Sequence, residues 1–89
     1  MPMLIIRHKV GEFGKWKQAY DAHADTRAAN GVISGRVTRS ADDPSQLVLL
    51  FEIADIAKAK AFIASPDLKS AMEAAGVIDK PDFYYLNDA

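Results

Sequence analysis

The amino-acid sequence predicts one α+β domain whose elements follow the order β-α-β-β-α-β. Two observations predict this class. Apolar residues recur with the spacings typical of strands and of helices, and turn-forming residues separate these segments. A chain of 89 residues has material for one hydrophobic core, so residues 1–89 are expected to form a single domain. The chain has no cysteine, which excludes disulfides, thiolate metal sites and cysteine nucleophiles.

The first half of the chain predicts a strand, a helix and a second strand. Residues 3–10 are apolar and β-branched at first and turn polar at Arg7, which is typical of a strand that emerges at its end. Residues 12–29 predict an amphipathic helix, which Asn30 and Gly31 end because both residues tolerate a left-handed conformation. The helical spacing is carried by Phe13, Trp16, Tyr20 and Ala24. Residues 32–39 alternate as a strand with one wet face and with Ile33, Gly35 and Val37 on its apolar side.

The second half predicts a hairpin, a broken helical region and a last strand. Residues 40–46 are turn formers, and residues 47–54 form a strand that is apolar on both faces. Asp55 is the expected N-cap of a helix over 56–64. The remaining boundaries are Ser65 as the cap of a second helix over Pro66–Ala75, Gly76 as its end, and a strand over 83–86 after Pro81.

This order of elements predicts a ferredoxin-like fold with a four-stranded antiparallel sheet. Right-handed crossovers place both helical regions on one face of the sheet, with the strands at 3–10 and 47–54 in its centre. The other face is left uncovered, although Val48 and Leu50 make it apolar. A second copy of the chain is the expected cover for this face.

Charge and hydropathy argue against several partners and locations. The net charge of −1 gives nucleic acid or an anionic membrane no bulk attraction, so neither is an expected partner. The strand at 47–54 has one Phe and no basic residue, which disfavours an RNA-recognition surface. The N-terminus has only a short apolar run, Met3–Ile6, and no basic region before it, so we expect a cytoplasmic protein.

Three stretches, residues 7–31, 39–55 and 65–86, resemble small bacterial proteins of the dimeric α+β barrel superfamily. This group includes the antibiotic-biosynthesis-monooxygenase-like proteins, whose members are often labelled cyclases or monooxygenases. The resemblance implies a homodimer in which two sheets pack their open faces into one barrel. It also implies a ligand cavity between sheet and helices in each subunit. Haem-degrading relatives use an Asn in the first strand. The first strand of this chain has no Asn, so no haem site is expected.

His8 is the first candidate catalytic residue. Although the sheet as a whole is predicted to be antiparallel, we expect its two central strands, at 3–10 and 47–54, to run parallel to each other. Glu52 would then lie beside His8 at one end of the sheet. A carboxylate beside an imidazole orients the ring and raises its pKa, which makes a general base. The alternative is a solvated strand end with a surface ion pair.

A second set of candidates follows one stripe of the first helix. Trp16, Tyr20, His23 and Arg27 are spaced by four, three and four residues and therefore share a face. Aromatic residues at one end and cationic or titratable ones at the other suit a flat, partly anionic aromatic molecule. The alternative is that Trp16 and Tyr20 pack in the core while His23 and Arg27 lie at its rim. Tyr84 and Tyr85 point to opposite faces of the last strand, so one of them is expected to face the same cavity and the other the dimer partner. We expect Tyr84 to be the residue that binds the ligand.

No metal site or tightly held cofactor is expected. His8, His23 and a carboxylate from Glu52 or Asp67 would make a two-histidine, one-carboxylate set, but no HxH, HxD or HExxH spacing supports it.

Two functions remain open at this point. One is a cofactor-independent, monooxygenase-like or cyclase-like enzyme that acts on an aromatic or polyketide-like substrate, with His8 or His23 as base and Arg27 stabilising an enolate or phenolate. The other is a non-catalytic ligand-binding or assembly domain of the same fold.

Overall fold

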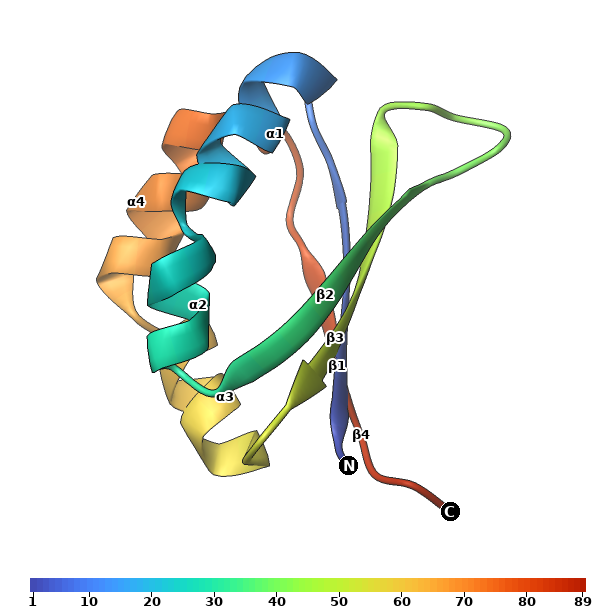
Figure 1. Cartoon of the computed structure of the whole chain (residues 1–89). Coiled ribbons are helices and arrows are strands. Elements are labelled where there is room, and N and C mark those ends of the chain that lie inside the picture. The colour runs from blue at the N-terminus through green and yellow to red at the C-terminus, as the bar shows by residue number, and fades with distance from the viewer.

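The computed structural model describes residues 1–89 and shows one layer of helices packed against one face of a four-stranded sheet (Figure 1). The elements are β1 (Met3–Lys9), α1 (Phe13–Ala22), α2 (Ala24–Ala29), β2 (Val32–Arg39), β3 (Gln46–Ile53), α3 (Ile56–Ile63), α4 (Pro66–Ala75) and β4 (Asp82–Leu86). The strand order is β2-β3-β1-β4, and every neighbouring pair is antiparallel. The α+β, ferredoxin-like prediction is confirmed. No helix is long and apolar enough to cross a membrane.

The expected parallel arrangement of the two central strands is wrong. A helical crossover from β1 to β2 leaves those two strands parallel, and the tight hairpin then reverses the chain, so β3 runs opposite to β1. In the observed register His8 pairs with Leu47, and Glu52 pairs with Met3. His8 and Glu52 therefore lie at opposite ends of the sheet.

The first helical region is divided at His23, where one continuous helix was expected. His23 lies in a turn with φ −93° and ψ 8°, after α1 and before α2. Backbone hydrogen bonds continue across this turn, because the amide of His23 donates to the carbonyl of Ala19 and its carbonyl accepts from Arg27. The two helices consequently keep a common inner face.

The caps predicted for the other helices are present. The Asp55 carboxylate accepts a hydrogen bond from the amide of Lys58, and the Ser65 hydroxyl accepts one from the amide of Leu68. Gly76 ends α4 with φ 93°, a conformation that is costly for any residue with a Cβ. The Ser65 cap, together with Pro66 at the start of α4, places the break between α3 and α4.

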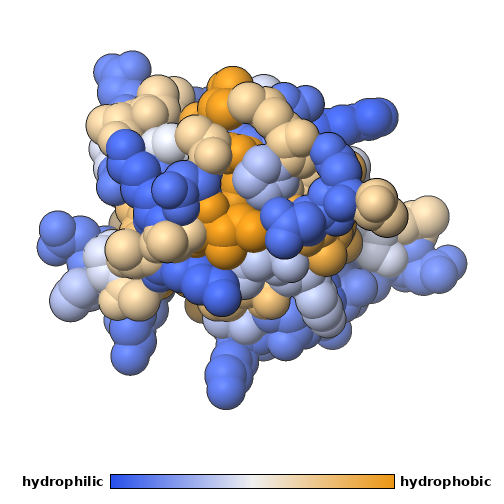
Figure 2. Space-filling view, turned by 90° about the horizontal axis from the view of Figure 1, so that it is seen from below, coloured by the Kyte–Doolittle hydropathy of each residue, from blue (hydrophilic) through white to orange (hydrophobic).

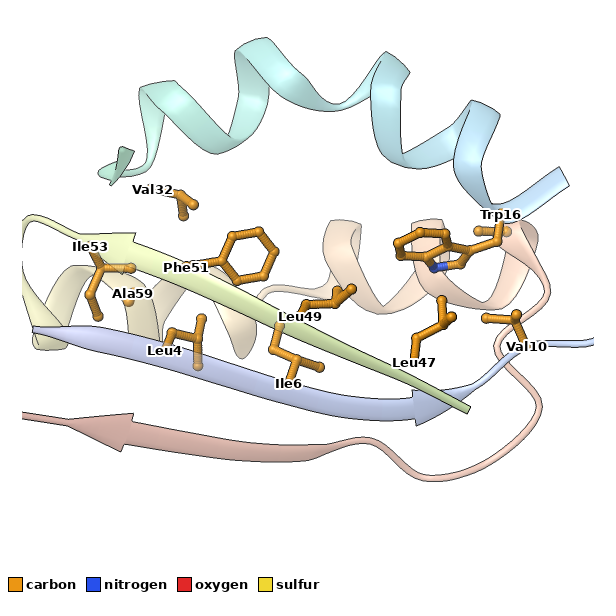
Figure 3. Close-up of a cluster of buried hydrophobic side chains, with 11 residues drawn as sticks. Leu4, Ile6, Val10, Trp16, Val32, Leu47, Leu49, Phe51, Ile53 and Ala59 are labelled. Atoms are coloured by element: carbon orange, nitrogen blue, oxygen red, sulfur yellow. The ribbon is translucent and has the colours of Figure 1, made fainter. Parts of the chain in front are cut away.

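The hydrophobic core lies between the helices and the inner face of the sheet (Figure 3). Trp16 reaches down from α1 at one end of this layer, near Leu47 and Val10, and Phe51 rises from β3 toward the helices. The inner positions of β1 and β3 alternate with half-buried or exposed ones, as expected for a sheet covered on one side only.

Strand β2 departs from the predicted alternation at its start. The pairing with β3 skips one residue between Val32 and Ser34, which marks a β-bulge. As a result Val32 is buried in the core, whereas Ile33, expected on the apolar side, is 52% exposed. Gly35 and Val37 keep the predicted inner face beyond the bulge.

The outer face of the sheet carries no helix and remains apolar in its middle. Val48 and Leu50 of β3 are half-buried by their strand neighbours alone. On β4, Tyr84 is 52% exposed and Leu86 is 41% exposed. This surface is the uncovered apolar face that the sequence predicts.

Two glycines offer a matched test of backbone conformation. A Cβ at Gly14 or at Gly76 would have no atom within 4 Å, but only Gly76 has a positive φ, of 93°. Gly14→Ala is expected to raise the free energy of unfolding by about 0.5–1 kcal/mol, because alanine loses less backbone entropy in α1. Gly76→Ala is expected to lower it by about 1–2 kcal/mol. Urea unfolding of both variants checks the pair, and an equal effect at the two positions would contradict it.

Candidate functional site

One cavity of about 90 Å³ lies between the helix layer and the inner face of the sheet and is partly open to solvent. Fourteen of its seventeen lining residues are hydrophobic or aromatic, and the other three are His8, His23 and Arg27. No acidic side chain lines it. Figure 2 shows the end of the molecule where α2 leads into β2, with apolar residues near the middle and hydrophilic side chains around them. Arg27 and Val32 contribute to the cavity from this end.

His8 is the buried polar residue of the core. It follows Leu4 and Ile6 on the inner face of β1, and the alternation of the strand directs its side chain inward. The residue is 1% exposed, and neither ring nitrogen has a hydrogen-bond partner. A buried polar group without a partner costs about 1–3 kcal/mol, so the ring nitrogens of His8 mark a place where a partner from outside the chain, a ligand or an ordered water, is expected.

Burial lowers the pKa of His8 below its ordinary value of 6.5. Asp79 opposes this shift by its negative charge, and Arg7 adds to it. The expected rise of the His8 pKa, and the alternative of a solvated surface ion pair, are both wrong because the strand direction takes Glu52 away and the core encloses the ring. His8 is therefore a neutral imidazole at neutral pH, with one nitrogen able to donate and the other able to accept.

Asp79 is held beside this end of β1 by its own contacts. Its carboxylate accepts hydrogen bonds from the Lys9 amide at 2.7 Å and from Arg7 Nη1 at 3.1 Å. These contacts, that of the Lys9 amide first, lower the pKa of Asp79. Arg7 also bonds Asp82 at 2.7 Å, so the segment between α4 and β4 is tied to β1.

A stack of aromatic rings forms one wall of the cavity. The Trp16 ring meets His8 edge-on with centroids 5.7 Å apart, and it stacks on Tyr20 at 5.0 Å. Tyr20 in turn lies over Phe51 of β3 at 6.3 Å. Rings in such contact gain stability from their geometry as well as from burial, and they also provide flat surfaces for an aromatic ligand.

Gly35 allows this stack to lie close to β2. It pairs with Phe51 across the sheet, and a Cβ at this position would stand 2.7 Å from both the Phe51 ring and the Tyr20 hydroxyl oxygen. Side chains do not approach so closely, so any other residue would push these rings toward the cavity. The absence of a side chain at Gly35 therefore helps to set the width of the site.

Arg27 and His23 form the polar part of the cavity away from His8. The Arg27 guanidinium lies 3.7 Å above the Tyr20 ring centroid, and its Nη1 donates to the Tyr20 carbonyl at 2.6 Å. No carboxylate lies within 4 Å of it, since the ion pairs of the molecule involve other groups. His23 is half-buried at the turn between α1 and α2, so its imidazole reaches the same cavity.

The structure brings together five of the predicted site residues, which are His8, Trp16, Tyr20, His23 and Arg27. The helical spacing of the last four is what places them on one wall. Two predicted residues lie elsewhere. Glu52 is exposed on the outer face of the sheet, and Tyr84 is also on that face, whereas Tyr85 is half-buried on the inner side.

No group of three histidine or acidic side chains is close enough to hold a metal ion. Glu52 lies on the far face, and Asp67 is exposed in the first turn of α4, so neither joins the two histidines in the cavity.

Sequence reasoning did not identify Phe51 and Gly35 as parts of the site. Glycine inside a strand was a usable signal, because it often marks a place where other groups approach the backbone closely. The contribution of α4, through Leu68 and Met72, depends on how the helices pack and has no local signature.

Comparison of sequences gives no relatives: no protein-family model and no curated protein matches the chain. Comparison of structures gives many. A protein of Bordetella bronchiseptica, provisionally assigned as an antibiotic biosynthesis monooxygenase, matches with a TM-score of 0.80 at 13% identity, over 99% of this chain and 96% of its own. SnoaB of Streptomyces nogalater, described as a cofactor-independent oxygenase, matches with a TM-score of 0.72 at 14% identity, over 99% and 94%.

A conserved protein of Methanosarcina mazei Go1 also matches, with a TM-score of 0.76 at 13% identity, over 99% of this chain and 92% of its own. These similarities extend over the whole chain in each case. They show that the chain has the fold of the antibiotic-biosynthesis-monooxygenase-like proteins, as the resemblance in its sequence predicted.

The lowered pKa of His8 predicts a pH-dependent stability. Between its folded pKa and about 6.5, the unfolded chain binds more protons than the folded one, so the free energy of unfolding should fall as the pH drops from 7 to 5. The slope contributed by His8 has an upper limit of about 1.4 kcal/mol per pH unit. Well above pH 6.5, from about pH 7.5, both states are neutral and this contribution is constant. The pKa values of Asp43 and Asp79 are also lowered, from 3.8. These two carboxylates therefore change stability mainly at pH values below the range from 5 to 7.

Urea unfolding followed by circular dichroism at several pH values between 5 and 8 measures this slope. His8→Phe is expected to remove it, and His23→Gln serves as the matched control that retains it. Identical slopes for wild type and His8→Phe would show that the buried imidazole is not the source.

Proposed function

We propose that this chain binds a small, mainly apolar or aromatic molecule in the cavity and acts on it as a cofactor-independent, monooxygenase-like enzyme with His8 as general base. The observation that carries this proposal is His8 itself, a buried neutral imidazole without a hydrogen-bond partner at the wall of an apolar cavity. A ligand hydroxyl or carbonyl placed there would supply the missing hydrogen bond. The fold shared with SnoaB, a cofactor-independent oxygenase, supports the same reaction class.

The proposed chemistry starts with proton transfer to the free ring nitrogen of His8. An anthrone or hydroquinone is acidic enough for such a base, and the resulting anion is rich in electrons. With an anthrone, the anion transfers electrons to dioxygen, which is the co-substrate, and the two combine into a peroxide anion that takes the proton back from His8 to give a hydroperoxide. Loss of water from the hydroperoxide leaves a quinone, so one dioxygen is consumed for each water and quinone formed. The imidazolium that forms next to the anion makes a close charge pair in a cavity lined mainly by apolar residues.

The same first step also starts a cyclase-like reaction. An enolate that attacks a carbonyl group within its own molecule closes a ring and consumes no oxygen. Trp16 and Tyr20 would hold a flat substrate by stacking in either case. Oxygen consumption therefore distinguishes the two reactions.

Oxygen uptake with dithranol and a panel of other anthrones and hydroquinones tests the proposal. Wild-type protein is expected to exceed the buffer control, and His8→Gln is expected to reduce the rate by about 10²–10⁴-fold, the range for loss of a general base. His23→Gln, which changes the other histidine of the cavity, should have the smaller effect. Turnover at the buffer rate with every substrate, or full activity in His8→Gln, would refute a base at this position.

A second candidate is a ligand-binding domain without catalysis. The size of the cavity supports it, because about 90 Å³, small beside the roughly 300–1,000 Å³ of sites for drug-sized ligands, has room for a small bound molecule but little room for a polycyclic substrate. Ligand binding that depends on His8, without oxygen uptake or ring closure, would identify this role.

We also propose that the chain acts as a homodimer in which the outer faces of two sheets pack together. Support comes from the apolar side chains on this face, among them Ile5, Val48 and Leu50. A two-fold interface of this kind would bury the exposed Tyr84. The cytoplasmic location expected from the sequence stays a prediction.

Sedimentation equilibrium tests the dimer. Wild-type protein is expected at twice the 9.7 kDa mass of one chain, and Leu50→Asp is expected to shift it to the monomer and to lower its stability, since the apolar face then meets water. Ser70→Asp places the same charge on the exposed side of α4 and should leave the dimer intact. A stable, folded wild-type monomer would rule out this assembly.

A further inference from the structure

We infer that the ligand of the cavity is an anion with two polar ends, a carboxylate held by Arg27 and a hydroxyl or keto group held by His8, on a flat apolar body. This inference rests on the proposed function, in which His8 receives the buried end of the ligand. It adds the charge of the ligand, its direction in the site and its approximate length.

The outer end of the cavity is suited to an anion because its cation has no partner. Arg27 is half-buried and lines the cavity, and its guanidinium bonds the carbonyl of Tyr20 and lies over its ring but forms no ion pair. The other arginine of comparable burial, Arg7, is paired with two carboxylates, Asp79 and Asp82. A guanidinium is well matched to a carboxylate, because its donors form two parallel hydrogen bonds with the two oxygens.

The lining of the cavity strengthens this preference. It contains Arg27 and two histidines but no acidic side chain. The chain as a whole carries a net charge of −1, so attraction for an anion does not come from the overall charge of the protein. Selectivity for a carboxylate must therefore arise from Arg27 itself, with His23 beside it.

The inner end of the cavity favours an oxygen-bearing group over a hydrocarbon tail. A hydrocarbon tail at the inner end would leave both ring nitrogens of His8 without partners, as they are now. A hydroxyl or keto oxygen there forms a hydrogen bond with the neutral ring. The two polar ends together therefore select a hydroxylated or oxidised carboxylate.

The aromatic wall connects the two polar ends of the cavity and sets an upper limit on their separation. His8 contacts Trp16 at 5.7 Å, Trp16 contacts Tyr20 at 5.0 Å, and Tyr20 contacts the Arg27 guanidinium at 3.7 Å. Two aromatic side chains thus separate the two polar groups. A slender molecule with one ring and a short conjugated arm, or with two fused rings, is a suitable probe because it carries a polar group at each end of a flat body.

Isothermal titration calorimetry with three matched probes tests the inference. 4-Hydroxycinnamate has both polar ends, cinnamate lacks the hydroxyl, and methyl 4-hydroxycinnamate lacks the charge. 4-Hydroxycinnamate is expected to bind wild-type protein at least tenfold more tightly than either of the others. In Arg27→Gln the preference for the acid over the ester should disappear, and in His8→Phe the preference for the hydroxylated acid over cinnamate should disappear.

Two further variants separate charge from structural effects. Arg27→Lys keeps the charge and should retain part of the preference for the acid. Arg36→Gln removes an exposed arginine outside the cavity and should leave all three affinities unchanged. Equal binding of the acid and the ester, with hydroxyl-dependent binding through His8 intact, would overturn this inference and leave the proposed function standing. Failure of every probe to bind would overturn this inference, whereas the proposed function is decided separately by oxygen uptake with the anthrones and hydroquinones.

Discussion

The two-residue alternation of β1 decides where the chemistry of this molecule lies. Helices cover only one face of the sheet, and Leu4 and Ile6 direct every second residue of β1 toward them. His8 follows in the same phase, so the alternation that builds the core also buries an imidazole in it. A register shift of one residue would turn His8 outward and expose the apolar residues as well. The position of the candidate base is therefore fixed by the stability of the whole sheet.

The cavity keeps two basic side chains in different states by different means. Burial among apolar residues disfavours the charged form of His8, and Asp79 only partly offsets this effect. Arg27 lies at the outer end on the face of Tyr20, where a guanidinium keeps its charge and gains from contact with the ring. A neutral hydrogen-bonding group and a permanent cation thus share one apolar site. Because the neutral imidazole lies at the inner end and the cation at the outer end, a ligand with two different polar ends would bind in one orientation.

Much of the fold and part of the site follow from local signals in the sequence. Caps, turn residues and apolar periodicity identify the elements, and the helical spacing from Trp16 to Arg27 brings four residues to one wall. The errors concern relations between strands. Glu52 was placed beside His8 because strand direction was taken from parallel sheets, although a crossover followed by a hairpin makes these strands antiparallel. Tyr84 was assigned to the inner face because period two alone does not say which face of β4 is inner.

The edge-on contact between Trp16 and His8 has a spectroscopic consequence. Trp16 is the only tryptophan of the chain, and its ring belongs to the wall of the cavity. The intrinsic emission of the protein excited at the red edge of the indole band therefore arises from one known position. Because the His8 ring is 5.7 Å away and Tyr20 is stacked on Trp16 at 5.0 Å, we expect that emission to respond to protonation of the imidazole and to a ligand bound against these rings. The molecule thus carries its own reporter of the cavity, without any label.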